Sequence, residues 1–183
     1  MQEKNKKNSL LLELARNTLK SQFNREKLDI SKDIKRKYSE KKACFITLTE
    51  DGELRGCIGS LNPHQELWKD IVDNSISAAF RDPRFLPLSS SELNNIKIEI
   101  SVLSAPKKIY FRDYNDLLKK MDKKMGIILK KGFYSSTFLP QVWKEIPDKT
   151  EFLENLSRKA GLDKNDWKDS EIWYYEVKSI KEE

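Results

Sequence analysis

Residues 43–59 read ACFITLTEDGELRGCIG, and this stretch decides the fold class. Its first half is rich in β-branched and aromatic residues, which are typical of strands. Asp51-Gly52 then stands between two apolar runs, and this dipeptide is a strong signal of a tight hairpin turn because such a turn requires positive φ values. We therefore predict an antiparallel hairpin with strands at about residues 43–49 and 54–58.

A helix and a third strand follow this hairpin. Apolar side chains recur at helical spacing over about residues 65–80, and two prolines then forbid continuation of the helix. Residues 96–102 alternate apolar and polar side chains, which predicts a strand. The isoleucines of this strand are expected to face the core, and Glu99 is expected to face outward or into a cleft.

The second half of the chain repeats this order of elements loosely. The pattern predicts a short helix, the two strands of a hairpin, a second helix and a last strand, at about 114–121, 126–130, 133–139, 149–160 and 172–177. Strands interleaved with short helices favour an α+β fold over a doubly wound parallel sheet. We therefore predict one mainly antiparallel sheet with helices, shared by two related halves at about 43–104 and 114–178.

The N-terminal part precedes this repeat. Residues 1–8 are polar and are predicted to be disordered, whereas residues 9–23 have the spacing of an amphipathic helix. Residues 24–41 are strongly charged, which indicates a solvated connection with short helical pieces. A chain of 183 residues fits one domain, so residues 9–183 are predicted to form a single domain.

Composition narrows the compartment and the partners. The chain has two cysteines, no recognisable secretory signal and no apolar run near the roughly 20 residues of a membrane helix, so we expect a cytoplasmic protein with free thiols. A net charge of +6 and a pI near 9.1 raise the question of nucleic acid. The basic residues are scattered among acidic ones, however, so nucleic-acid binding ranks last among the hypotheses.

The segment Arg55-Gly56-Cys57-Ile58-Gly59 is the first candidate for chemistry. Two glycines within a strand permit a bulge or a close approach of backbone and ligand, so Gly56 and Gly59 are candidate ligand-binding positions. A thiol beside Arg55 lies in a positive setting that favours the reactive thiolate. The alternative is that Cys57 is a small core residue beside a bulge, because free cysteines are often buried.

His64 is the only histidine, so every histidine-dependent mechanism must use it. A neutral imidazole seven residues after Cys57 can take a proton from a thiol or substrate, but a surface histidine that stabilises the turn is an equal alternative. Cys44, Cys57 and His64 supply too few soft ligands at a recognised spacing for structural zinc. No metal site is predicted, although one completed by carboxylates stays open.

Three further side chains are candidates for binding a substrate. Arg84 either clamps a carboxylate or phosphate, which its fork geometry matches, or locks adjacent loops, and neighbouring Asp82 is favoured as a structural turn residue. Glu99 is either a base that reaches a cleft or a solvent-facing strand residue. Gln141 either binds a ligand or satisfies backbone groups.

Taken together, these segments resemble the AMMECR domain family over roughly residues 9–178. The segments that carry the resemblance are Gly52-Glu53-Leu54-Arg55-Gly56-Cys57-Ile58-Gly59-Ser60, Pro63-His64, Ala78-Ala79-Phe80-Arg81-Asp82-Pro83-Arg84-Phe85, Glu99-Ile100-Ser101-Val102-Leu103-Ser104, Phe138-Leu139-Pro140-Gln141-Val142-Trp143 and Lys159-Ala160-Gly161-Leu162. Pro63-His64 and Leu139-Pro140-Gln141-Val142 are similar to the prokaryotic branch, called AmmeMemoRadiSam system protein A.

The resemblance implies an α+β fold of two related halves and partnership with a Memo-type protein and a radical-SAM protein. It defines no activity, and the cofactor, if there is one, is unknown. Two hypotheses follow. In the first, the protein is an enzyme or enzyme component that acts on a small anionic substrate through Cys57, assisted by Arg55 and His64. In the second, it is a non-catalytic adaptor that binds a ligand or partner in a Memo and radical-SAM system.

Overall fold

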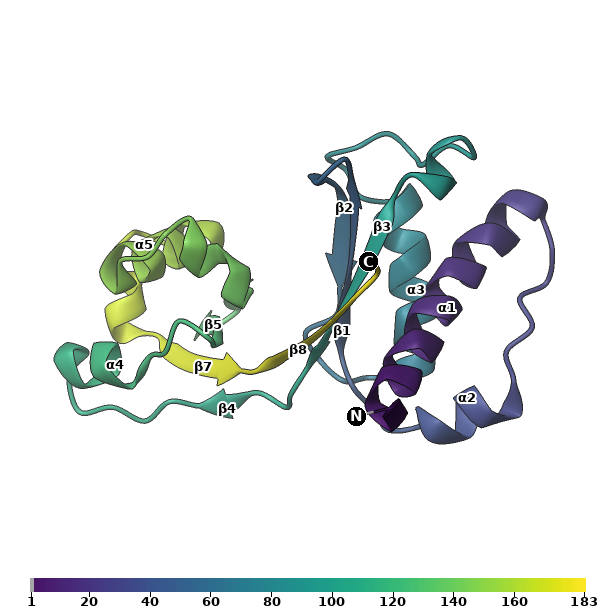
Figure 1. The fold of residues 1–183 in the computed structure, drawn as a ribbon. Coiled ribbons are helices and arrows are strands. Elements are labelled where there is room, and N and C mark those ends of the chain that lie inside the picture. Colours follow the sequence, from purple (N-terminus) through teal and green to yellow (C-terminus); the bar gives the residue numbers. More distant parts are fainter. Residues whose placement is uncertain (1) are drawn as a thin grey trace. The chain divides into compact units, whose positions relative to one another are not determined.

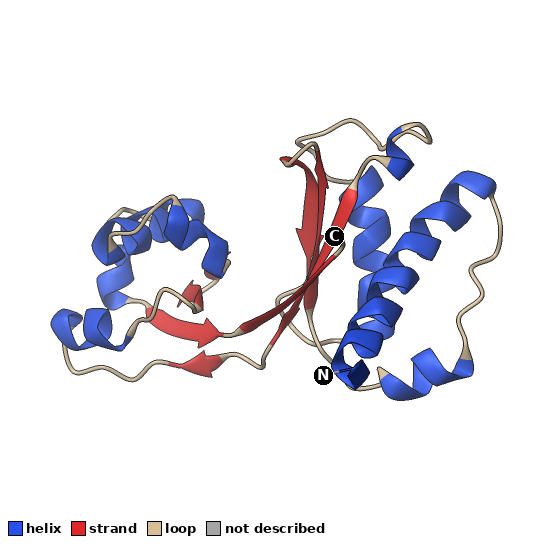
Figure 2. Cartoon of the chain, viewed as in Figure 1, coloured by secondary structure: helices blue, strands red, loops and turns tan. Residues whose placement is uncertain are grey.

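The computed structural model describes residues 2–183, with side chains from residue 10 onward. The chain forms two compact units, the first comprising residues up to Leu103 together with Lys178–Glu183, and the second comprising Ser104–Val177. Each unit has its own four-stranded sheet and its own hydrophobic core. The predicted α+β class is confirmed, and Figure 2 shows helices and strands in both units.

The sheet of the first unit has the strand order β2-β1-β3-β8. Its strands are β1 (Cys44–Glu50), β2 (Glu53–Gly59), β3 (Lys97–Leu103) and β8 (Val177–Lys181). Strand β1 pairs antiparallel with both β2 and β3. Asp51 and Gly52 have φ values of 51° and 87°, so the predicted hairpin turn is confirmed.

Helices cover one face of this sheet. Helices α1 (Gln2–Asn24) and α3 (Leu67–Phe80) lie side by side on it, and the shorter α2 (Lys32–Lys37) interrupts the charged connection, as Figure 1 shows. The face beneath α3 is apolar because its β1 and β3 side chains point inward: Ile46, Leu48, Ile98 and Ile100 are fully buried. The predicted inward orientation of the isoleucines is thus confirmed.

Helix α1 begins before its predicted start. Its buried apolar side chains, Leu11, Leu14 and Leu19 among them, recur only where the helix packs on the core. The apolar spacing therefore predicted the later turns of the helix and missed the first ones. Residues 2–8, which were predicted to be disordered, belong to the first turns of this helix, and Met1 lies outside the described residues.

The second unit has the strand order β4-β7-β5-β6. Its elements are β4 (Lys107–Lys108), α4 (Tyr114–Lys120), β5 (Gly126–Lys131), β6 (Tyr134–Phe138), η2 (Pro140–Lys144), α5 (Lys149–Lys159), η3 (Asp166–Asp169) and β7 (Glu171–Tyr175). The side chain of Asp148 accepts a hydrogen bond from the Glu151 amide and caps α5. In the core, Trp143 stacks on Phe152 with ring centroids 3.6 Å apart.

The two halves repeat one arrangement, in which a hairpin's first strand also pairs with the third strand: β2-β1-β3 in one unit and β6-β5-β7 in the other. The predicted single shared sheet is wrong, because there are two. Strand β4 follows β3 in sequence but pairs with β7, and β8 follows β7 but belongs to the sheet of β3. The chain changes sheet next to Pro106, which has no backbone N–H to continue a ladder.

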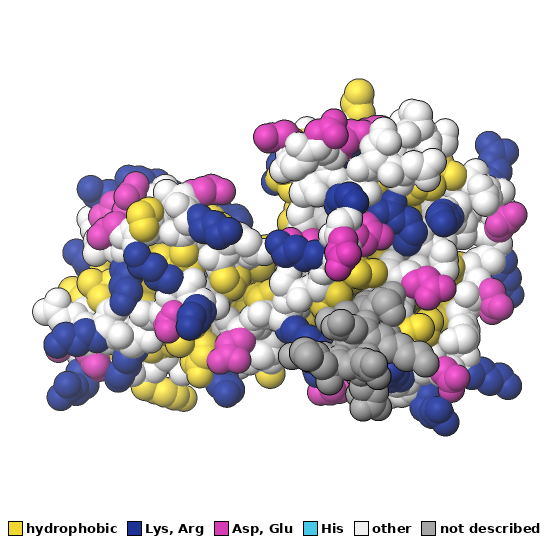
Figure 3. Space-filling model, viewed as in Figure 1, with side chains coloured by type: hydrophobic (Ala, Val, Ile, Leu, Met, Phe, Trp, Pro, Cys, Tyr) yellow, Lys and Arg dark blue, Asp and Glu magenta, His cyan; other side chains and the backbone are white. Residues whose placement is uncertain are grey.

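Two surface properties bear on function. Figure 3 shows cationic and anionic side chains intermixed over the face that it presents, rather than gathered into a basic stripe. Among the described residues, no helix is both long enough and apolar enough to cross a bilayer.

Candidate functional site

The segment Arg55-Gly56-Cys57-Ile58-Gly59 forms the second half of β2, at the edge of the first sheet. The β1–β2 register shifts at Arg55, since Leu48 pairs with Gly56 but Thr49 pairs with Leu54. This irregularity is the bulge that the glycines predicted. It places Cys57 opposite Thr47, whereas an unbroken ladder from the turn would place Cys57 opposite the buried Ile46.

Both glycines of the segment allow close packing. A Cβ atom at Gly56 would lie 2.2 Å from the backbone oxygen of Ala78 in α3. A Cβ atom at Gly59 would lie 2.3 Å from Cγ of Phe45 and 2.5 Å from the backbone oxygen of Cys44. Their predicted role in ligand binding is untested, but this packing alone explains why side chains are absent here.

On the outer side of β2, where no further strand pairs, side chains bind the backbone of Cys57. Its N–H donates to Oδ2 of Asp82 at 2.8 Å, and its carbonyl accepts from Nη2 of Arg84 at 3.3 Å. The Cys57 thiol is half-buried and lies 3.3 Å from Oγ1 of Thr47. Asp82 and Arg84 therefore satisfy the outward backbone groups of Cys57, which disfavours pairing of this part of the edge with another strand.

The side chains of Asp82 and Arg84 form an ion pair with each other. Nε and Nη2 of Arg84 donate to the two oxygens of Asp82 at 2.9 and 2.7 Å, a bidentate pair. The Arg84 guanidinium and the Cys57 amide hold the pKa of the Asp82 carboxyl well below its usual range, although burial opposes this shift. Only 2% of the Asp82 side chain is exposed, against 53% for Arg84, so Asp82 is structural and Arg84 also faces solvent.

Arg55 binds neighbouring groups of the protein. Its Nε donates to Oε1 of Glu92 at 2.6 Å, and its Nη2 donates to the carbonyl of Leu86 at 3.0 Å. The Arg55 guanidinium and the Ser89 amide lower the pKa of Glu92 to about 2. The third guanidinium nitrogen, Nη1, is buried and has no hydrogen-bond partner among the described residues.

These contacts fix a segment that we call the anchored loop, residues 81–91, between α3 and the short helix η1 (Glu92–Asn94). Phe85 lies near two cations, with the guanidinium carbons of Arg55 and Arg84 at 5.9 and 5.4 Å from its ring centroid. Leu88 is buried in the core, but the Leu86 side chain is 83% exposed. The loop is thus bound at several points and presents one large apolar side chain to solvent.

The Arg55–Glu92 pair predicts an acid-sensitive contribution to stability. The folded pKa of Glu92, about 2, lies below the value of about 4.3 for an unperturbed glutamate, so the stabilisation is complete above pH 4.3 and is lost as the pH falls toward 2. Glu92→Gln should therefore lower the free energy of unfolding by about 1–2 kcal/mol at pH 6. The difference from the unmodified protein should vanish near pH 2 in urea titrations.

The exposed Glu53 at the start of β2 supplies the control. Glu53→Gln should change stability by no more than about 0.5 kcal/mol at pH 6. A loss from Glu92→Gln that is equally large at pH 6 and pH 2 would contradict an ionic contribution.

The structure brings only some of the predicted site residues together. Arg55, Cys57 and the two glycines lie on β2, and Arg84 contacts the Cys57 backbone. Arg55, however, binds Glu92 instead of the thiol. His64 is exposed in the loop before α3, with Nδ1 3.1 Å from the carbonyl oxygen of Asn62. Among the described residues, the Cys57 thiol and the His64 ring share no hydrogen bond.

Two further predicted residues lie elsewhere. Glu99, on β3, forms an ion pair with Lys181 at 2.9 Å and accepts a hydrogen bond from Ser179. It thus faces away from the core, as predicted, and both oxygens contact β8. Gln141 is exposed in η2 of the second unit. No group of three or more His, Cys, Asp or Glu side chains in the described part of the chain is placed to hold a metal ion.

Several residues of the site escaped the sequence reasoning. Glu92, three residues after Ser89, has the spacing of a capping box; one of its oxygens accepts from the Ser89 amide, but the other binds Arg55. No sequence pattern marked Thr47 as a neighbour of Cys57, because the bulge determines which β1 residue pairs with Cys57. Leu86 could have been noticed as an apolar residue between two prolines of a loop.

The chain combines two related halves, each with its own sheet, with a bulged edge strand and the anchored loop. The AMMECR1 family model matches residues 12–180, and the chain belongs to this family. It is 39% identical to Protein Mbar_A1807 of Methanosarcina barkeri, covering 93% of this chain and 88% of that protein. It is 37% identical to Protein NEQ441 of Nanoarchaeum equitans, with 94% and 99% covered.

A solved structure supports the same assignment. The crystal structure of the uncharacterized protein PH0010 from Pyrococcus horikoshii matches with a TM-score of 0.85 and 32% sequence identity. The match covers 94% of this chain and 90% of that one.

Proposed function

We propose that the protein is a non-catalytic adaptor that binds a partner protein through the anchored loop. The observation that carries this proposal is the way Arg55 holds Leu86. The guanidinium binds the Leu86 carbonyl while the Leu86 side chain stays 83% exposed, so the loop is fixed with an apolar residue directed outward. Binding residues on loops that a rigid scaffold positions are common in proteins.

The surroundings of Leu86 support a protein partner. The half-buried Phe85 precedes Leu86 and lies against the guanidinium of Arg84, and aromatic and arginine side chains are frequent hot spots of protein interfaces. The partner surface that fits this loop is an apolar pocket with acidic groups at its rim. In an AMMECR-type system, the candidates are the Memo-type protein and the radical-SAM protein that the family resemblance implies.

The pairing of the other candidate residues supports binding over catalysis. Arg55 is engaged with Glu92, Glu99 with Lys181, and Asp82 with Arg84. Arg55 and Asp82 thus hold the anchored loop against the edge of β2, whereas Glu99 is engaged with β8.

The test is the affinity of the full chain for the purified Memo-type and radical-SAM proteins of the same genome, measured by calorimetry. Leu86→Asp should weaken binding by about 30-fold, the effect of losing a hot spot worth about 2 kcal/mol. It should leave the midpoint of thermal unfolding within about 2 °C, because the replaced side chain is exposed.

Phe133, in the second unit, is a matched control because its side chain is fully exposed. Phe133→Asp should leave the affinity within twofold. Equal losses from both variants, or no binding of either protein by the unmodified chain, would count against the anchored loop as the docking site.

A second candidate function is thiol chemistry at Cys57 on a small anionic substrate. It is favoured by the bulge, which places the thiol opposite Thr47 instead of the buried Ile46, and by the exposed guanidinium of Arg84 nearby. In this scheme Cys57 is the nucleophile or redox-active thiol, His64 moves a proton, and Arg84 binds the anion. Gln141 and Glu99 would position the substrate.

The pH dependence of Cys57 alkylation distinguishes the two functions. Cys44 is fully buried, so Cys44→Ala supplies a background with one thiol. Thiol chemistry requires an alkylation rate that titrates well below the unperturbed value of about 8.5 and shifts with His64→Ala. The adaptor proposal expects no effect of His64→Ala on this rate.

A further inference from the structure

A groove in the first unit shares no residue with the anchored loop or with residues 55–59. It has a volume of about 240 Å³ and lies where α1, α2, β3 and β8 meet the start of α3. Its apolar lining comes from Leu11, Leu67, Val102 and Ile180, and its polar lining from Lys37, Tyr38, Glu40, Lys42 and Lys178. Side chains distant in sequence thus converge on one concave apolar surface.

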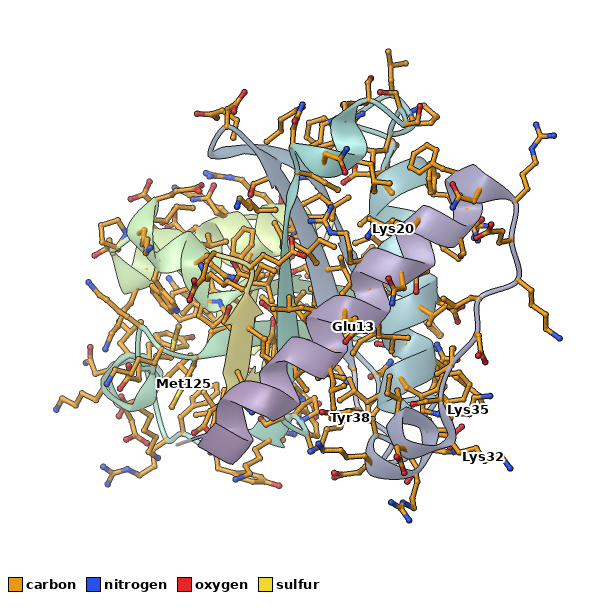
Figure 4. All side chains as sticks on the ribbon, turned by 45° about the vertical axis from the view of Figure 1, so that its right-hand side comes forward. Glu13, Lys20, Lys32, Lys35, Tyr38 and Met125 are labelled. Carbon is orange, nitrogen blue, oxygen red and sulfur yellow. The ribbon has the colours of Figure 1, made fainter. Side chains whose placement is uncertain are left out.

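The wall of the groove is held in place by backbone hydrogen bonds. The amide of Leu67 donates to the Glu40 carbonyl at 3.0 Å, and the amide of Trp68 donates to the Tyr38 carbonyl at 3.4 Å. The backbones of Lys41 and Glu66 pair in an isolated antiparallel β-bridge. The segment that carries Tyr38 is therefore joined to the N-terminus of α3, and Figure 4 shows Tyr38 near α1 while Lys32 and Lys35 project from α2.

The polar lining carries an excess of positive charge. The lining contains three lysines and one glutamate. The glutamate is already paired, since Lys42 Nζ lies 2.9 Å from Glu40 Oε2. Lys37 and Lys178 form no ion pair with any carboxylate whose side chain is described. Burial raises the pKa of Tyr38, so its hydroxyl adds no negative charge at neutral pH. An anion at this rim would meet unneutralised ammonium groups.

We infer that this groove binds a small amphipathic carboxylate, with the apolar body on Leu11, Leu67 and Ile180 and the carboxylate beside Lys37 and Lys178. The combination of an apolar lining with a few convergent polar groups is typical of small-molecule sites. The volume corresponds to roughly eight waters, which matches an acid of about six carbons. For so few atoms, the dissociation constant should be on the order of 1 mM.

The experiment is an NMR titration of the full chain with hexanoate, 1-hexanol and acetate, observed at the methyl groups of Leu11, Leu67, Val102 and Ile180. Hexanoate should cause saturable shifts at these methyls. 1-Hexanol, which has the same apolar body without the charge, should bind at least fivefold more weakly. Acetate, which has the charge without the body, should cause no saturable shift.

Charge reversal tests the rim with a matched control. Lys178→Glu should weaken hexanoate binding by about tenfold, because it places an anion at the position of the carboxylate. Lys32→Glu makes the same change of net charge at an exposed residue of α2 outside the groove, and it should change the affinity by less than twofold.

Each other outcome overturns the inference. Absence of saturable shifts up to about 20 mM hexanoate would show that the groove takes no such ligand. Equal binding of 1-hexanol, or equal effects of the two charge reversals, would show that the rim lysines do not recognise the anion. Leu86→Asp should leave hexanoate binding unchanged, so this inference and the adaptor proposal can fail separately.

Discussion

Replacing Gly56 with valine is expected to lower the free energy of unfolding of the first unit by about 3 kcal/mol or more. A Cβ atom at Gly56 would lie 2.2 Å from the backbone oxygen of Ala78, and a valine adds two further methyl groups. Backbone atoms of α3 cannot rotate away as a flexible side chain can, so the edge of the sheet and the helix must separate. Urea titration followed through the methyl resonances of Ile46 and Leu48 measures this loss.

A substitution at an exposed position of the same strand supplies the control, since valine itself favours strands more than glycine does. Leu54, two residues earlier, is 43% exposed, and Leu54→Ala should cost no more than about 1 kcal/mol. If Gly56→Val proved no more destabilising than Leu54→Ala, the close contact between β2 and α3 would be refuted.

The second large effect is expected from Asp82→Ala. This change leaves the Cys57 amide without its acceptor and removes the bidentate partner of Arg84, at a cost of about 2–3 kcal/mol. It should also weaken partner binding, though less than Leu86→Asp does, because the anchored loop loses one attachment to β2 and keeps the contacts of Arg55 with Leu86 and Glu92. Calorimetry and urea titration on the same preparations measure the two effects.

Asp82→Asn separates the two contributions of this carboxylate. The amide oxygen of asparagine can still accept from the Cys57 N–H, but the charge that pairs with Arg84 is gone. We therefore expect a loss smaller than that of Asp82→Ala. If both variants matched the unmodified protein in stability and in affinity, Asp82 would have no anchoring role.

Much of the fold could be predicted because its signals are local. Asp51-Gly52 adopts the positive φ values that a tight hairpin turn requires, and residues 96–102 alternate as a half-buried strand does. Strand β4 has two residues and β8 has mostly exposed side chains, so neither produces a recognisable hydrophobic pattern. No sequence pattern therefore indicated that these strands are exchanged between two sheets, and one shared sheet was predicted instead.

The candidate site depended on longer-range contacts. Counting pairs from the hairpin turn places Cys57 opposite the buried Ile46, and a single extra residue at Arg55 moves it opposite Thr47. The glycines indicated a bulge but not its position. Arg55 and Glu92 are 37 residues apart and Cys57 and Asp82 are 25 apart, so their pairing follows only from the packed fold.

The central claim is that the anchored loop binds a partner and that the Cys57 thiol does not act in this function. The most direct measurement compares Cys57→Ser with Leu86→Asp in the calorimetric titration of the Memo-type and radical-SAM proteins. We expect an affinity within twofold of the unmodified chain for Cys57→Ser and about 30-fold weaker binding for Leu86→Asp. Loss of binding in Cys57→Ser together with unchanged binding in Leu86→Asp would contradict a docking role of the anchored loop.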